Sequence, residues 1–215
     1  MELEVAIAGG HGKIGLRLGE MLAAAEHTVL GLIRDPAQAG DLQAVGVEPV
    51  VCDLEGDDDL AAAVRGVDAV VFAAGAGPGS GAERKRTMDL EGAVKLIDAA
   101  RAGGIRRYVM VSASGAADPP AAGGEVFGEY LRAKAAADRA LEASGLDYTI
   151  VRPGRLSDDP PTGLVELGPD VAGGPIARAD VAAVLLAALE SERTVGRTLG
   201  LRAGEMPIEA AIAAL

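Results

Sequence analysis

A tyrosine and a lysine four residues apart, Tyr130 and Lys134, are the side chains in this sequence best suited to acid–base chemistry. One helical turn separates them at the start of a predicted helix, so both project from the same face. An ammonium beside a phenol favours the phenolate and lowers the pKa of the tyrosine, which lets it act as a general acid or base near neutral pH. The alternative is a structural pair, with Tyr130 half-buried and Lys134 exposed.

Two serines, Ser112 and Ser114, lie at and just after the end of the β-rich run RYVMVS (107–112), which precedes this pair. A serine hydroxyl near Tyr130 would hold the oxygen of a substrate carbonyl. Together with the tyrosine and the lysine, the serines predict a site where a proton is exchanged with a small-molecule substrate.

Four glycines in AIAGGHGKIG (6–15) raise the question of what comes so close to this backbone that side chains are excluded. The glycines lie between a predicted strand at 3–8 and a helix that starts near Lys13. Such a turn lets backbone N–H groups approach a pyrophosphate, and the helix N-terminus adds unpaired donors and partial positive charge. We therefore expect a dinucleotide here rather than a merely structural turn, held by Gly9, Gly10, Gly12, Lys13, Ile14 and Gly15.

The second predicted strand (28–33) is followed by Arg34 and Asp35, about twenty residues beyond the glycines, where an arginine binds a 2′-phosphate and an acid binds the ribose. Because Arg34 comes first, the sequence favours NADP(H), and NAD(H) remains possible with Asp35 as the ribose partner. Asp53 could bond the adenine amine or cap the following helix. Ala74 and Gly75 end the fourth strand almost without side chains, as a site under a ribose requires.

Apolar strands alternate with helical patterns along the whole chain. Strands are expected at 3–8, 28–33, 47–51, 68–74, 107–112, 147–151 and 197–201, and helices at 14–22, 60–64, 88–102, 131–143 and 181–189. This alternation predicts an α/β fold: one doubly wound parallel sheet, Rossmann-like, of about seven strands with helices on both faces. Residues 1–215 are expected to form a single domain, with an irregular lid at about 154–175.

Composition limits the classes of partner. The formal net charge of −12 argues against nucleic acid, which is bound through clustered Lys and Arg. No apolar run reaches the roughly 18 residues of a membrane span. The single cysteine, Cys52, and the lack of a charged-then-apolar leader favour a cytoplasmic protein. No metal site is expected from two histidines and one cysteine, and the protein is expected to be a monomer or homodimer.

Several stretches together resemble the short-chain dehydrogenase/reductase superfamily. They are AIAGGHGKIG, LIRD, VVCDL, VFAAGAG, YVMVSAS, YLRAKAAAD and SGLDYTIVRPGRL, and they cover nearly the whole chain. The likeness is to its small atypical members, the NmrA-like proteins and the biliverdin/flavin reductase type. One departure is Asp89, where many relatives carry an asparagine, which puts a proton relay through that position in doubt.

The resemblance implies a role for each matching residue. Gly9, Gly12 and Gly15 would hold the pyrophosphate, and Arg34 would meet the adenosine phosphate. Lys134 would bond the nicotinamide ribose as well as tune Tyr130, while Ser114, or less readily Ser112, would orient the substrate. The adenine would lie by Asp53 and Leu54, the ribose by Ala74 and Gly75, and the nicotinamide by Pro153 and Gly154.

Three functions fit these residues. The first is an NAD(P)H-dependent reductase that transfers a hydride to a small carbonyl, quinone, flavin or similar acceptor. The second is a dinucleotide sensor without turnover. The third is an isomerase or dehydratase that uses the cofactor transiently and consumes no NADPH; a sugar-nucleotide epimerase is disfavoured because few residues follow Pro153 for a substrate domain.

Overall fold

Seven parallel strands form the centre of the molecule in the computed structural model, which describes residues 2–77, 79–121 and 126–215. Their order is β10-β6-β5-β4-β1-β2-β3, so the strand order reverses between β1 and β4, the switch point at which such sheets bind ligands. The strands are β1 (Glu4–Ala8), β2 (Thr28–Ile33), β3 (Glu48–Val51), β4 (Ala69–Phe72), β5 (Arg107–Val111), β6 (Asp147–Pro153) and β10 (Arg197–Ala203).

These seven strands are the seven that the sequence predicts. Further strands come from the segment expected to be an irregular lid and from residues 206–207 near the end of the chain. β8 (Leu164–Gly168) runs antiparallel to β10, and β11 (Met206–Pro207) pairs with β8, which brings the sheet to nine strands among the described residues. β7 (Arg155–Ser157) and β9 (Pro175–Ala177) pair separately. β8 lacks the continuous apolar run of the central strands, because in it only Val165 and Gly168 are buried, and the glycines and prolines around it favour a loop.

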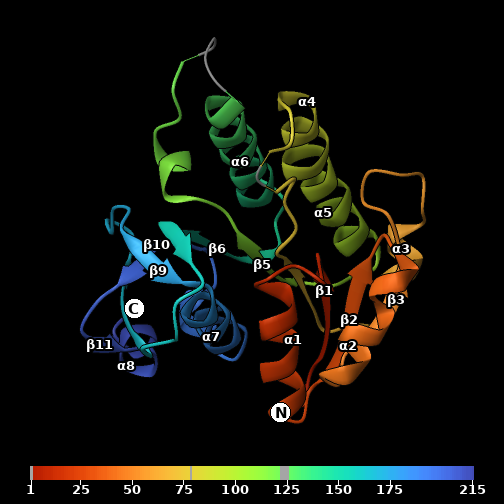
Figure 1. Cartoon of the computed structure of the whole chain (residues 1–215), viewed down its shortest axis with the longest axis horizontal. Helices are drawn as coiled ribbons and strands as arrows, with labels where there is room; N and C mark the ends of the chain where they lie inside the picture. The colour runs from red at the N-terminus through yellow and green to blue at the C-terminus, as the bar shows by residue number, and fades with distance from the viewer. Residues whose placement is uncertain (1, 78, 122–125) are drawn as a thin grey trace.

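Helices cover both faces of the sheet (Figure 1). One face packs against α1 (Gly15–Ala24), α2 (Ala39–Ala44), α7 (Arg178–Leu189) and α8 (Ile208–Ala213). The other carries α3 (Leu60–Ala63), α4 (Ala82–Arg84), η2 (Lys85–Gly92), α5 (Ala93–Ala102) and α6 (Val126–Glu142). Short 3-10 turns are η1 (Pro36–Gln38), η3 (Ser114–Ala117) and η4 (Glu192–Thr194). Among the described helices, none is long and apolar enough to cross a membrane.

Strand β1 contributes side chains to the hydrophobic cores on both faces of the sheet. Val5 and Ile7 belong to the core under α1 and α7, whereas Ala6 and Ala8 belong to the core under α5 and α6. Successive side chains of a strand point to opposite faces, and both faces are covered here, so the strand reads as a continuous apolar run.

The helix predicted from Met88 begins earlier and has an unusual middle. α4, η2 and α5 follow one another without a break from Ala82 to Ala102, and η2 is a π-helical segment. Its wider turn buries Lys85, Met88 and Asp89 against the neighbouring α6. Since π-helical turns often occur at functional sites, this segment marks a part of the molecule to inspect for chemistry.

Candidate dinucleotide cleft and active site

The glycine turn is shaped first by contacts within the chain. Gly9 has φ of +82°, and a side chain on it would meet the backbone of Ala74 at 2.7 Å. A side chain on Gly15 would come within 2.3 Å of the Gly9 carbonyl oxygen. The end of β4 and the turn itself therefore come so close to this backbone that no side chain fits there. The other side of Gly9 and Gly12 lines a cavity.

A cavity of about 330 Å³ lies between the glycine turn and the ends of β2, β3 and β4. Seven of the residues predicted to bind the dinucleotide line it: Gly9, Gly12, Arg34, Asp53, Leu54, Ala74 and Gly75. Gly10 and Gly15 do not line it, because they pack against β2 and within the turn. We call this space the adenosine cavity.

Arg34 and Asp35 take different positions. Arg34 is 54% exposed and lines the adenosine cavity, with Nη1 3.9 Å from Glu55 Oε2. The Asp35 carboxylate accepts a hydrogen bond from the Ala37 backbone N–H at 3.0 Å and caps η1, outside the cavity lining. The arginine, rather than the acid, therefore lines this cavity.

Asp53 lines the adenosine cavity and also stabilises its own turn. Its Oδ1 accepts a hydrogen bond from Glu55 N at 2.9 Å. The alternative of a helix cap is wrong for this residue, because Asp59 caps α3 by accepting from Ala62 N at 3.0 Å.

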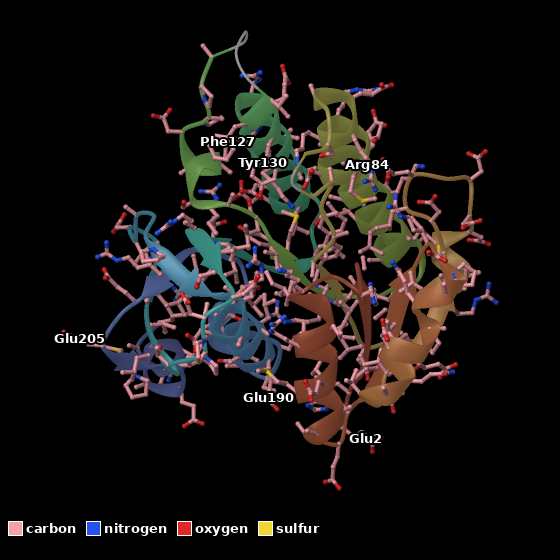
Figure 2. All side chains as sticks on the ribbon, viewed as in Figure 1. Glu2, Arg84, Phe127, Tyr130, Glu190 and Glu205 are labelled. Carbon is pink, nitrogen blue, oxygen red and sulfur yellow. The ribbon has the colours of Figure 1, made fainter. Side chains whose placement is uncertain are left out.

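Sequence reasoning missed Arg84, which reaches the adenosine cavity from α4 (Figure 2). Its Nε and Nη2 both donate to Glu55 Oε2 at 3.0 Å, and Thr87 donates to Glu55 Oε1 at 2.6 Å. Burial alone raises the pKa of Glu55, but these bonds together hold it below its usual value. A charged carboxylate therefore anchors Arg84 beside Arg34.

A second cavity, of about 630 Å³, adjoins the first. Both cavities are lined by the stretch 73–76, which follows β4 with almost no side chains. The second is lined by Tyr130, Lys134 and Ser112, and by Lys13 and Ile14 of the glycine turn. We call it the acceptor cavity.

Lys134 is buried and paired. Its Nζ lies 3.2 Å from Asp89 Oδ1 and donates to the Val111 carbonyl at 3.1 Å. Asp89 Oδ2 accepts from Ala76 N at 3.2 Å, so η2 is tied to the floor shared by the two cavities. The alternative of an exposed lysine is therefore wrong, and Asp89 is part of the site.

Tyr130 lines the acceptor cavity, but its pKa does not shift as the sequence suggested. Burial raises the pKa of Tyr130, and Asp89 and Asp138 add to that rise, which together outweigh the lowering by Lys134. The predicted net lowering is wrong because burial of the phenol, helped by the charges of Asp89 and Asp138, outweighs the effect of the lysine charge. Without a bound ligand, the phenol keeps its proton at neutral pH.

The two serines are separated by the structure. Ser112 lines the acceptor cavity and donates to Asp138 Oδ2 at 2.9 Å, and Arg152 Nε donates to the same oxygen at 2.8 Å. Burial raises the pKa of Asp138 in spite of both bonds. Ser114, the preferred residue, begins η3 and lines neither cavity; its hydroxyl lies close to Gly173.

Pro153 and Gly154 also lie outside both cavity linings. Gly154 N donates to the Leu201 carbonyl at 3.0 Å, and a side chain on it would collide with the Gly174 backbone. The acceptor cavity is reached instead by Leu156, two residues further along on β7.

An ion-pair bridge connects the glycine turn to the C-terminal part of the chain. Asp158 accepts from Lys13 Nζ at 2.5 Å and from Arg178 Nη1 at 2.8 Å. The hydrogen bond from Lys13 is the largest cause that lowers the pKa of Asp158, and Arg178 adds to it. Residues 145 positions apart thus meet where the acceptor cavity borders the glycine turn.

No group of three or more His, Cys, Asp and Glu side chains that could hold a metal ion occurs in the part of the chain that the structure describes. The donors present suit a dinucleotide, since open glycine backbone, a helix N-terminus and arginines line two adjoining cavities that together form a trough.

The fold and the trough define a nucleotide-binding protein of the Rossmann class. A model of the NAD(P)H-binding family matches residues 9–192, and the chain belongs to this family. The atypical short-chain dehydrogenase/reductase assignment agrees with the match and with the neighbours below.

Similar proteins carry different functional names. "Uncharacterized sugar epimerase YhfK" of Bacillus subtilis is 40% identical over 212 residues, which is 98% of this chain and 99% of the relative. A Bacillus halodurans structure, described provisionally as an NAD-dependent epimerase/dehydratase, superposes with a TM-score of 0.93 at 38% identity, covering 99% and 100% of the two chains. The anaerobillin reductase ChuY of Escherichia coli O157:H7 has a TM-score of 0.76 at 26% identity, covering 92% and 96%.

Proposed function

We propose that the protein is an NADPH-dependent reductase that transfers a hydride to a small carbonyl, quinone, flavin or similar acceptor. The observation that carries this proposal is that the adenosine cavity and the acceptor cavity adjoin each other and share the floor at 73–76. A dinucleotide laid along that floor would run from Arg34 at one end to Tyr130 at the other.

The chain's own residues would position and protonate the reactants. When bound, NADPH supplies the hydride to the acceptor carbon. Tyr130, kept protonated by burial, would donate its proton to the acceptor oxygen and regain one from solvent. Holding both reactants in one trough accounts for much of the lowering of the barrier, because it replaces a bimolecular encounter.

The preference for NADPH over NADH rests on Arg34. Its exposed guanidinium lines the adenosine end, where a 2′-phosphate would accept charge-assisted hydrogen bonds. Asp35, which would favour the ribose of NADH, is occupied in capping η1.

A second candidate function is favoured by the relatives whose printed names include epimerase. Such an enzyme would use the dinucleotide transiently and consume no NADPH. The protonated state of Tyr130 supports the reductase, because an epimerase that removes a proton needs the tyrosine as a base. A sensor without turnover is less supported, since Tyr130 lines an open cavity.

The first test is calorimetric titration of NADPH and NADH into the protein and into Arg34→Ala. We expect NADPH to bind at least tenfold more tightly, a difference of about 1.4 kcal/mol, and the substitution to remove most of that preference. If neither dinucleotide binds, the glycine turn is only structural and the proposal fails.

The second test follows NADPH absorbance with a panel of carbonyl, quinone and flavin acceptors. Tyr130→Phe should slow reduction of carbonyls by roughly 10²-fold or more, as expected for loss of a general acid. Tyr148→Phe is the matched control, because Tyr148 lies on β6 outside both cavity linings. Tight NADPH binding with no oxidation by any acceptor would favour the sensor.

A further inference from the structure

Lys85, on η2, is a second lysine beside Tyr130 in the acceptor cavity. It is 9% exposed, its Nζ donates to the Gly77 carbonyl at 2.7 Å, and the same nitrogen lies 5.2 Å from the centre of the Tyr130 ring. An ammonium has three donors, and a carbonyl and a ring face do not neutralise its charge. A buried charge of this kind is costly unless an opposite charge comes to it.

The other charges around the acceptor cavity are already paired. Lys134 is neutralised by Asp89, while Lys13 and Arg178 share Asp158. No carboxylate of the described residues lies within 4.0 Å of the Lys85 ammonium, and Asp89 is the one acid among the described lining residues. The described lining of the cavity is therefore cationic although the whole chain carries a net charge of −12.

The remaining wall of the cavity is apolar and partly aromatic. Phe127 and Tyr130 lie with ring centres 5.9 Å apart on the first turns of α6, and both are labelled in Figure 2. Phe127 is 65% exposed although it lines the cavity, which leaves its ring available to a flat ligand. Leu156 and Ile14 contribute aliphatic surface to the same lining.

We propose that Lys85 binds an anionic group, a carboxylate, sulfonate or phosphate, on an acceptor whose flat apolar body lies against Phe127. That the ligand is a hydride acceptor rests on the proposed function. With the anion on Lys85, the reacting oxygen of the same molecule comes to Tyr130, the residue whose ring the ammonium faces. Lys85 is then a specificity-determining residue.

The probe pair is anthraquinone-2-sulfonate and anthraquinone-2-sulfonamide, which share a flat body and differ in charge. Each is titrated by calorimetry into protein saturated with NADP⁺. We expect the sulfonate to bind at least tenfold more tightly than the sulfonamide, as charge-assisted hydrogen bonds require. Equal affinities, or no binding of either probe, would overturn the proposal without any variant being made.

Two substitutions assign the selectivity to Lys85. Lys85→Met should weaken sulfonate binding by roughly tenfold and change sulfonamide binding by less than twofold, while Lys85→Arg should retain most of the selectivity. Arg86→Met is the matched control, because Arg86 is the next residue but pairs with Glu91 away from the cavity. Persistence of full selectivity in Lys85→Met would also overturn the proposal, and NADP⁺ affinity reports whether each variant is folded.

The same probes separate this proposal from the reductase itself. Selective, Lys85-dependent binding of the sulfonate without NADPH oxidation supports the anion site and contradicts the reductase. Oxidation of NADPH by both quinones at the same KM supports the reductase and contradicts the anion site.

Discussion

The ammonium of Lys134 and the carboxylate of Asp89 lie 3.2 Å apart, and both side chains are buried, 3% and 0% exposed. A pair of this kind is weak support for stability, but breaking it leaves one charge buried alone. Asp89 also counteracts the influence of Lys134 on Tyr130. Loss of one partner would therefore affect both the packing of η2 against α6 and the pKa of the tyrosine.

Asp89→Asn should lower the pKa of Tyr130 and reduce the free energy of unfolding by about 3 kcal/mol, because Lys134 loses its partner. Tyrosinate absorbance against pH measures the first effect, with Tyr130→Phe identifying the signal; urea unfolding measures the second. Asp98→Asn, at an exposed position on α5, should change neither. An unchanged Tyr130 titration in Asp89→Asn would show that Asp89 does not influence the phenol.

Glu55→Gln should tighten NADPH binding by roughly threefold or more and leave NADH binding within twofold. The carboxylate lies 3.9 Å from Arg34 and opposes a phosphate there, whereas glutamine keeps an acceptor for Arg84 without the charge. Calorimetry with both dinucleotides checks this, and Glu91→Gln, in an exposed ion pair, is the control. Equal gains for both cofactors would mean that the 2′-phosphate lies elsewhere.

Acid should stabilise the wild-type protein relative to Asp138→Asn. The pKa of Asp138 is raised above 3.8 by burial, so the folded state takes up a proton before the unfolded state does. The stability that this proton contributes is fully present below the unfolded pKa and is lost as the pH rises through the folded pKa. Urea unfolding between these two pKa values should show the free energy of unfolding of the wild type rising relative to that of the variant as the pH falls. If the difference between the two proteins does not change with pH, the raised pKa of Asp138 is contradicted.

Gly15→Ala should destabilise the protein by a few kcal/mol and abolish NADPH binding, because its Cβ would lie 2.3 Å from the Gly9 carbonyl oxygen. Gly40→Ala, in α2 with nothing within 4 Å, should stabilise the protein by about 0.5–1 kcal/mol. Thermal unfolding and NADPH titration of both variants test the pair. Retained binding in Gly15→Ala would show that the turn tolerates a side chain.

The parallel sheet was predictable because a strand covered on both faces is apolar along nearly its whole length, as β1 and β5 are after their first residue. The glycine turn was predictable for a related reason: Gly9 and Gly15 have no room for a side chain. Local pattern was enough in both cases.

Other features depend on contacts between distant segments, which no local pattern carries. Asp89 and Lys85 look like ordinary helix residues until η2 turns them toward α6. The serine preference reversed because the strand ends at Val111, which leaves Ser112 at the cavity and moves Ser114 into η3. Glu55 and Arg84, 29 positions apart, meet only in the folded chain.

The π-helical segment serves as a partition between the two halves of the trough. Arg84 and Thr87 hold Glu55 on the adenosine side, whereas Lys85 and Asp89 face the acceptor side, and all four come from little more than one wide turn. A shift of that turn would therefore change the binding of the cofactor and of the acceptor together. Coupling between two bound ligands is reciprocal. If the bound cofactor changes the affinity for the acceptor by some factor, the bound acceptor must change the affinity for the cofactor by the same factor.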